Sequence, residues 1–142
     1  MILACMLFSI CSVPTVLDVP TSKITNNDIQ CLAANIYFES RGEPKRGQIA
    51  VAHVTINRKK NSAFPNTICK VVKQHKQFSW YNTKKRDMNE YTFPKQIRKL
   101  ATDILLGKYK DPTNGSLYFH NTSVGPFDRK ETVRIGDHIF YM

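Results

Sequence analysis

The chain has 142 residues, which suits one domain and leaves no room for two of ordinary size. Hydrophobic residues make up 42% and charged residues 23%, which is enough for a single core and is typical of a globular protein rather than a disordered one. Lys and Arg number 21 against 11 Asp and Glu, for a net charge of +10. Such a field attracts polyanions, either nucleic acid or an anionic cell wall, although a basic surface can also serve solubility alone.

An apolar stretch opens the chain, MILACMLFSICSVPTVL, and a proline-containing linker follows it. The stretch is too short and interrupted for a membrane span. It resembles the core of a secretory signal, although the usual preceding Lys or Arg is missing. An uncleaved anchor or a buried first helix are the alternatives. We expect residues 1–25 to be leader and linker, residues 26–142 to be the folded domain, and the protein to be exported.

The first predicted helix runs from about Asp28 to Ser40, where apolar residues recur every three or four positions. Asn26 and Asn27 are the expected N-cap residues. Gly42 is expected to end the helix.

A second helix is predicted from Pro44 to about Arg58, and its near-continuous apolar sequence identifies it as the buried central element. A third, shorter helix is predicted from Pro65 to about Gln74. A fourth is predicted from Pro94 to Gly107.

The last third of the chain has the composition of β-strands rather than of helices. The segments SLYFH and TVRIGDHIFYM are rich in aromatic and β-branched residues, and they predict a small antiparallel hairpin near the C-terminus. A long polar loop that also carries aromatic residues separates the third helix from the fourth, and its length indicates function or mobility. The expected fold class is therefore α+β, mainly α, with a helical domain around a buried central helix.

Glu39 is the first candidate for chemistry. At 100° per residue it lies roughly 20° from Leu32 and 60° from Ile36 around the helix axis, on the margin of the apolar stripe. A carboxyl group against apolar side chains has its neutral form favoured, so we expect a raised pKa, as a glycosidase acid requires. The alternative is a helix-end glutamate paired with Arg41 or Lys45.

The other titratable residues are weaker candidates for a catalytic or metal-binding role. Glu43 precedes a proline, and we interpret it as a structural residue; the second carboxylate of a glycosidase site is the alternative. His53 lies in the buried helix and is interpreted as a core histidine. The remaining histidines and the four cysteines show no metal-ligand spacing, so no metal or cofactor is expected.

Aromatic side chains alternate with amides in the second half of the chain. Aromatic platforms flanked by amides suit sugar rings, and they also suit single-stranded nucleic acid or a core. These residues are Phe78, Trp80, Tyr81, Tyr91, Tyr118 and Phe119, mixed with Gln77, Asn82 and Asn121.

Residues 33–58 read AANIYFESRGEPKRGQIAVAHVTINR, and this segment closely resembles the cell-wall hydrolase family typified by spore cortex-lytic enzymes. The shared pattern is a glutamate at a helix end, an Arg-Gly-Glu-Pro turn, a Gly-Gln pair and a closing Asn-Arg. In this chain those residues are Glu39, then Arg41, Gly42, Glu43 and Pro44, then Gly47 and Gln48, then Asn57 and Arg58. Downstream matches are Phe64-Pro65, Gln77-Phe78-Ser79, Tyr118-Phe119-His120 and the closing Gly136-Asp137-His138-Ile139-Phe140-Tyr141.

The resemblance implies a lysozyme-like fold and cleavage between N-acetylmuramic acid and N-acetylglucosamine of peptidoglycan, with Glu39 as the catalytic glutamate. It implies structural roles for Arg41, Gly42, Glu43 and Pro44. We expect a monomer in the periplasm or cell wall, or delivered there by a phage, with glycan strands and not nucleic acid as its partner. Phe127 stands where relatives often have tryptophan. The residues implied to contact substrate are Gln48, Gln77, Phe78, Ser79, Trp80, Tyr118, His120, Asn121 and His138.

We favour a lytic transglycosylase, in which one glutamate is acid and then base and a 1,6-anhydro product forms. A hydrolytic muramidase would need a second carboxylate, for which Glu43 is the nearby candidate. Rival interpretations are an amidase, a catalytically silent wall-binding protein and a nucleic-acid-binding module.

A disulfide between Cys31 and Cys69 is also expected. Both cysteines flank apolar positions of helices that must pack on the buried helix, and the wall lies outside the cytoplasm, where disulfides persist. Two buried free thiols are the alternative.

Overall fold

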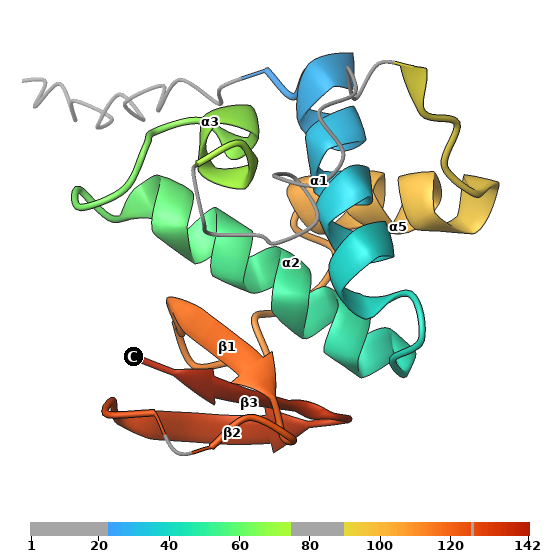
Figure 1. The fold of residues 1–142 in the computed structure, drawn as a ribbon. Coiled ribbons are helices and arrows are strands. Elements are labelled where there is room, and N and C mark those ends of the chain that lie inside the picture. Colours follow the sequence, from blue (N-terminus) through green and yellow to red (C-terminus); the bar gives the residue numbers. More distant parts are fainter. Residues whose placement is uncertain (1–22, 75–89, 126) are drawn as a thin grey trace, which may run out of the picture.

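The computed structural model of the chain describes residues 23–74, 90–125 and 127–142. In the described residues four helices precede a small sheet, as the expected α+β, mainly helical class requires, and Figure 1 shows α2 lying between the other helices and the sheet. In the described part no helix has the length and apolar character needed to cross a membrane. The elements are α1 (Asn26–Ser40), α2 (Lys45–Lys60), α3 (Ile68–Val72), α5 (Lys95–Leu105), β1 (Tyr118–Asn121), β2 (Glu131–Ile135) and β3 (His138–Tyr141).

A capping box starts α1. The Thr25 hydroxyl oxygen accepts the Asp28 N–H at 3.1 Å, and the Asp28 carboxylate accepts the Thr25 N–H at 3.0 Å. The prediction of Asn26 and Asn27 as caps is therefore wrong by one or two residues, because a Thr paired with an acidic residue at the third helical position satisfies two backbone donors reciprocally.

The helix α2 is buried on nearly all sides, which confirms it as the central element. Ala52 joins the core formed with the other helices, while Ala50, Val51 and Val54 pack against the sheet. The core on the helical side contains, among others, Leu32, Ile36, Ile68, Val72, Ile97, Leu100 and Ile104.

The helix α3 is shorter than predicted. It begins at Ile68 and not at Pro65, because the Thr67 hydroxyl caps it by accepting the Lys70 N–H at 3.2 Å. It ends at Val72, with Lys73 as its C-cap residue.

The predicted disulfide between Cys31 and Cys69 is present, with the two Cα atoms 5.3 Å apart. It joins the first half of α1 to α3, and both half-cystines lie in the helical core.

The predicted C-terminal hairpin is instead a three-stranded antiparallel sheet in the order β1-β3-β2. Residues 132–142 supply two strands and not one, because the chain reverses at Gly136, whose φ of 58° favours glycine.

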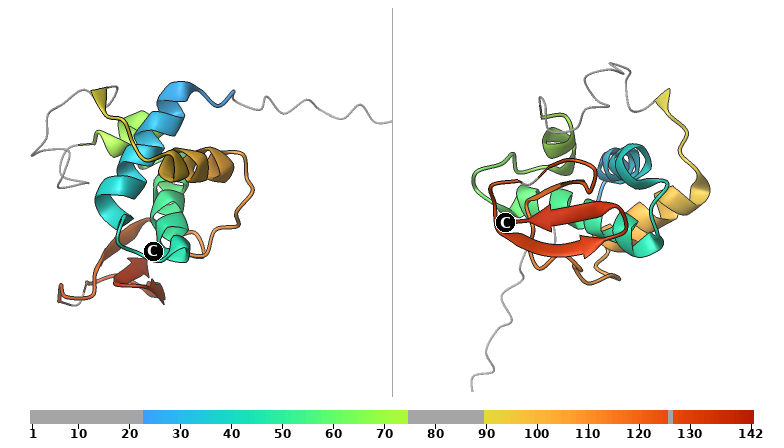
Figure 2. Two further views of the ribbon diagram at one scale, coloured as in Figure 1. Left: turned by 90° about the vertical axis from the view of Figure 1, so that its right-hand side faces the viewer. Right: turned by 60° about the horizontal axis from the view of Figure 1, so that its bottom comes forward.

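Side chains of the sheet alternate between two faces. Phe119 and Phe140 face α2, whereas His120, Ile139 and Tyr141 line a pocket on the opposite face, which we call the outer face. Figure 2 shows the sheet from two further directions.

Candidate functional site

Glu39 lies on the last turn of α1 and is half-buried, as the helix geometry predicts. The residue after it, Ser40, is buried and its hydroxyl donates to the Ile36 carbonyl at 2.8 Å. The rings of Tyr37 and Phe38 precede it and pack edge to face, 5.3 Å apart. The carboxyl group is therefore carried by a turn whose other side chains are fixed in place.

The buried side chain of Arg58 interacts electrostatically with Glu39. It lies near the end of α2, is only 4% exposed, and its Nε donates to the Leu117 carbonyl at 2.7 Å. Burial lowers the pKa of Arg58 to about 10, while Tyr118 and Glu39 act in the opposite direction. A guanidinium with that pKa is still positive at neutral pH, so the site holds a buried cation within the electrostatic range of the glutamate.

Arg58 was not among the site residues predicted from the sequence. The available signal was the Asn-Arg pair that closes the 33–58 motif. Its first member, Asn57, donates to the Asp111 carboxylate at 2.9 Å and to the Ser116 carbonyl at 3.1 Å. Asp111 also accepts the N–H groups of Thr113 and Gly115. The pair therefore fixes the segment that leads into β1.

The turn between α1 and α2 contains the Arg-Gly-Glu-Pro sequence, and its contacts are internal to the protein. The Glu43 N–H donates to the Ser40 carbonyl at 2.9 Å, and the Arg41 guanidinium lies 4.9 Å from the centre of the Tyr37 ring. Pro44 is the N-cap residue of α2. Gly42 lies at the exposed turn between Arg41 and Glu43.

Glu43 reaches from this turn to the tip of the β2–β3 hairpin. One carboxylate oxygen, Oε2, accepts the Asp137 N–H at 2.9 Å. The other, Oε1, lies 3.9 Å from Nδ1 of His138, and both side chains are about nine-tenths buried. The Glu43 carbonyl accepts the Gln48 side-chain amide at 3.1 Å. Glu43 and Gln48 are thus engaged in holding the turn against the sheet.

Of the other residues implied to contact substrate, Tyr118 and His120 lie on β1, and His120 is on the outer face. The His120 Nδ1–H donates to the Asn121 carbonyl at 2.8 Å, which leaves Nε2 to accept the Tyr141 hydroxyl at 2.8 Å. The Asn121 side chain accepts the Ser123 N–H at 2.9 Å.

His138 lies on β3 and is only 6% exposed. Its ring packs edge to face on Phe119 at 5.1 Å. Burial lowers the pKa of His138, and Glu43 opposes that shift.

Four of the residues implied to contact substrate, Gln77, Phe78, Ser79 and Trp80, lie outside the described residues, as do residues 1–22 of the expected leader. Among the residues that are described, no three His, Cys, Asp or Glu side chains gather as a metal site requires. His53 is a buried residue of α2. Burial lowers its pKa, and a hydrogen bond to the backbone of Tyr109 opposes that shift.

Comparison with known proteins gives consistent results. The model of the family described as Cell Wall Hydrolase matches residues 42–141. The spore cortex-lytic enzyme of Bacillus cereus is 38% identical over 132 residues, covering 85% of this chain and 49% of that protein. The Bacillus subtilis enzyme of the same name is 37% identical over 121 residues, covering 82% of this chain and 38% of that protein. The chain thus spans about half, or less, of the curated relatives it matches.

Two solved structures are similar to this chain in fold and in sequence. The catalytic domain of the Bacillus cereus SleB protein superposes with a TM-score of 0.74 at 34% identity, covering 85% of this chain and 94% of that one. The catalytic domain of the germination-specific lytic transglycosylase SleB from Bacillus anthracis superposes with a TM-score of 0.73 at 34% identity. The match covers 87% of this chain and 100% of that one. These matches confirm the resemblance of residues 33–58 and the fold class, and the chain belongs to the Cell Wall Hydrolase family.

Proposed function

We propose that this chain cleaves the glycosidic bond between N-acetylmuramic acid and N-acetylglucosamine in peptidoglycan, with Glu39 as the acid and then the base. The observation that carries the proposal is the setting of Glu39, half-buried on the last turn of α1 and electrostatically coupled to the buried cation of Arg58. A single carboxyl group held in this way suits a reaction in which one residue both gives and takes a proton.

The proposed reaction uses this one carboxyl group twice. Glu39 donates its proton to the glycosidic oxygen as the bond to the muramic anomeric carbon breaks. The C6 hydroxyl of the same muramic residue then attacks the oxocarbenium-like carbon and gives its proton to the Glu39 carboxylate. The product is a 1,6-anhydro sugar, and the glutamate is restored. Arg58 contributes a fixed positive charge that favours the carboxylate between the two steps.

The contacts of the Glu43 carboxylate favour formation of the 1,6-anhydro product over hydrolysis. A hydrolytic enzyme of the inverting type needs a second carboxylate free to activate water. Both carboxylate oxygens of Glu43 face the β2–β3 hairpin, one in a 2.9 Å hydrogen bond. The similarity to a catalytic domain described as a lytic transglycosylase supports the same choice.

The residues that touch the glycan are part of the proposal. Gln77, Phe78, Ser79 and Trp80 come from the segment before α5, and Tyr118, His120 and Asn121 come from β1. Gln48 and His138 are assigned a supporting role, because their side chains hold the turn and the hairpin. The protein acts as a monomer at the wall, outside the cytoplasm, without a cofactor.

Mass spectrometry of fragments released from purified peptidoglycan tests the proposal. We expect fragments that end in 1,6-anhydro-muramic acid and are one water lighter than the hydrolytic products, with the same yield after dialysis against a chelator. Reducing muramic ends would establish hydrolysis instead. Free stem peptides with intact glycan would establish an amidase.

A further inference from the structure

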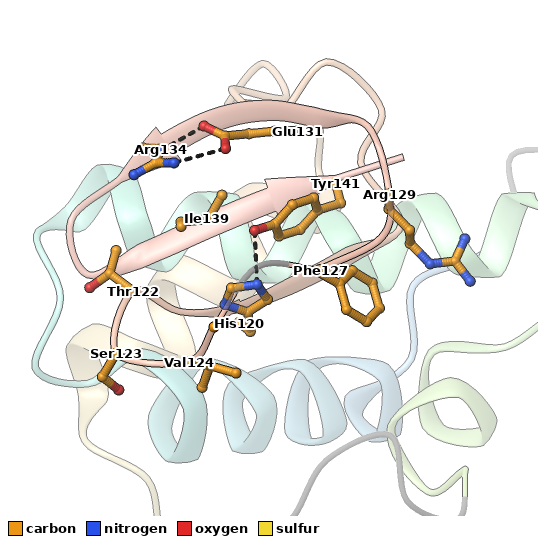
Figure 3. Close-up of a pocket in the computed structure, with 11 residues that line it drawn as sticks. His120, Thr122, Ser123, Val124, Phe127, Arg129, Glu131, Arg134, Ile139 and Tyr141 are labelled. Atoms are coloured by element: carbon orange, nitrogen blue, oxygen red, sulfur yellow. Dashed lines mark hydrogen bonds and ion pairs between the residues drawn. The ribbon is translucent and has the colours of Figure 1, made fainter.

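A pocket of about 470 Å³ opens on the outer face of the sheet, on the side away from α2. The β1–β2 connection crosses this face and forms one wall, with Thr122, Ser123 and Val124 along it, as Figure 3 shows. The volume lies within the range of pockets that bind small ligands. Glu39 is not among the residues that line this pocket.

The floor of the pocket is aromatic and rigid. The rings of His120 and Tyr141 stack 5.0 Å apart and are joined by the 2.8 Å hydrogen bond between them. Phe127 packs edge to face on Tyr141 at 5.4 Å, and Figure 3 shows the three rings gathered together. Such a surface presents apolar ring faces beside fixed polar atoms, as the faces and hydroxyl edges of a sugar require.

Two hydrophobic side chains at this pocket are exposed to solvent. Phe127 is 44% exposed and Val124 is 56% exposed, and both lie on the β1–β2 connection. Clustered exposed apolar side chains rimmed by polar groups mark binding surfaces more often than single ones do. The exposure therefore points to a ligand that covers this connection.

The charge of the rim argues against a phosphate backbone. Arg134 is neutralised by Glu131 through hydrogen bonds of 2.7 and 2.9 Å, so this end of the pocket presents little net charge. Nucleic acid needs several cations directed at its phosphates. Arg129 stacks on the Tyr118 ring at 3.8 Å, which uses the guanidinium face and leaves its N–H edge available to a neutral acceptor.

Tyr118 connects this pocket to the surroundings of Glu39. Its ring is contacted by Arg129 and Phe127 of the pocket and, at 5.5 Å, by the Arg58 guanidinium, the group whose pKa responds to Glu39. Tyr118 therefore lies between the pocket and the buried cation that interacts electrostatically with Glu39.

We propose that the outer-face pocket binds an N-acetylated sugar of the glycan strand at a distance from the bond that is cleaved. The inference rests on the proposed function. Phe127 supplies the apolar contact, Arg129 donates to an acetamido or hydroxyl oxygen, and the His120–Tyr141 pair holds the floor. The site gives the chain affinity for strands longer than the cleaved disaccharide.

Binding is measured with the Glu39→Gln protein, so that cleavage does not interfere, by calorimetry with a soluble chain of six β-1,4-linked N-acetylglucosamines and by pelleting with purified sacculi. Phe127→Ala, added to this protein, should weaken both by roughly tenfold, the scale of losing an aromatic anchor. Phe127→Trp should restore binding. Leu106→Ala is the matched control, since Leu106 is an exposed apolar residue, 57% exposed, at the end of α5, and it should change nothing.

Unchanged binding by a folded Phe127→Ala protein would overturn the inference, as would failure of Phe127→Trp to restore it. A parallel loss of single-stranded DNA binding would assign the pocket to nucleic acid instead. Should Phe127→Ala unfold, Val124→Glu tests the same point from an exposed rim position. An intact chain that binds glycan through Phe127 but cleaves none would refute the proposed function and keep this inference.

Discussion

The carboxylate of Glu43 accepts the backbone N–H of Asp137 at 2.9 Å, although the two residues are 94 positions apart in the sequence. Glu43 follows Glu39 by one helical turn of sequence, and Asp137 forms the tip of the β2–β3 hairpin. The contact therefore ties the end of the glutamate helix to the sheet. The approach depends on Gly136, where an added Cβ would lie 1.8 Å from Glu43 Oε2.

Glu43→Ala should destabilise the protein by about 0.5–1.5 kcal/mol, the net value of one hydrogen bond, because it removes the acceptor of the Asp137 N–H at the exposed tip of the hairpin. Glu43→Gln retains an acceptor oxygen and should cost less. Gly136→Ala should lower the unfolding midpoint as well, and the part of that loss due to the clash with Glu43 should be absent when Glu43→Ala is already present, whereas the part due to the positive φ should remain. Urea unfolding of the three variants and the double variant measures this. Additive effects would mean that Gly136 and Glu43 do not act on each other.

Replacing Cys31 and Cys69 by serine should destabilise the chain by about 3–4 kcal/mol, the chain-entropy value for a loop of this size. The sequence separation is 38, and the bond joins α1 to α3. Thermal unfolding of the oxidised protein, the reduced protein and the double serine variant measures this. Equal midpoints for oxidised and reduced protein would contradict the prediction.

Stability should fall as the pH drops below about 6.5, the ordinary value for histidine. Burial lowers the pKa of His53 in the fold, so below that pH the unfolded chain binds a proton more readily than the native one. Above it both forms are neutral and the effect vanishes. His53→Gln should reduce the loss between pH 7.5 and 5 without removing it, because the pKa of His138 is lowered too. An unchanged pH dependence in His53→Gln would exclude this histidine.

Binding of the Glu39→Gln protein to sacculi should weaken as salt rises. The net charge of +10 attracts an anionic polymer, and exposed charges are screened beyond a Debye length of roughly 8 Å at physiological ionic strength. Co-sedimentation at increasing sodium chloride measures the effect. Salt-independent binding would mean that the basic surface takes no part in targeting.

The helical half of the fold was predictable because its signals are local. The spacing of Leu32 and Ile36 gave α1 and the margin position of Glu39, and the apolar sequence of α2 gave its burial. The disulfide followed from two helices that must share one partner. The cap at Thr25 was missed because two asparagines after it offered similar chemistry.

The site was less predictable, because its contacts join distant parts of the chain. No local pattern connects Glu43 to Asp137, whose hydrogen bond exists only after the helices and sheet have packed. The electrostatic influence of Glu39 on the buried Arg58 likewise depends on how the helices pack. The third strand was missed at Gly136-Asp137, a two-residue turn between two β-rich runs that is itself a hairpin signal.

We propose that Glu39 carries the proton in glycan cleavage. Glu39→Gln keeps the shape of the side chain and removes the transferable proton, and exposed Glu90→Gln is the matched control. The measurement is the rate of fragment release from purified peptidoglycan, with thermal unfolding to verify the fold. We predict that Glu39→Gln unfolds like the parent and releases fragments at least about a hundredfold more slowly, while Glu90→Gln is unaffected. A folded Glu39→Gln protein with near-parental activity would exclude Glu39 as the proton donor.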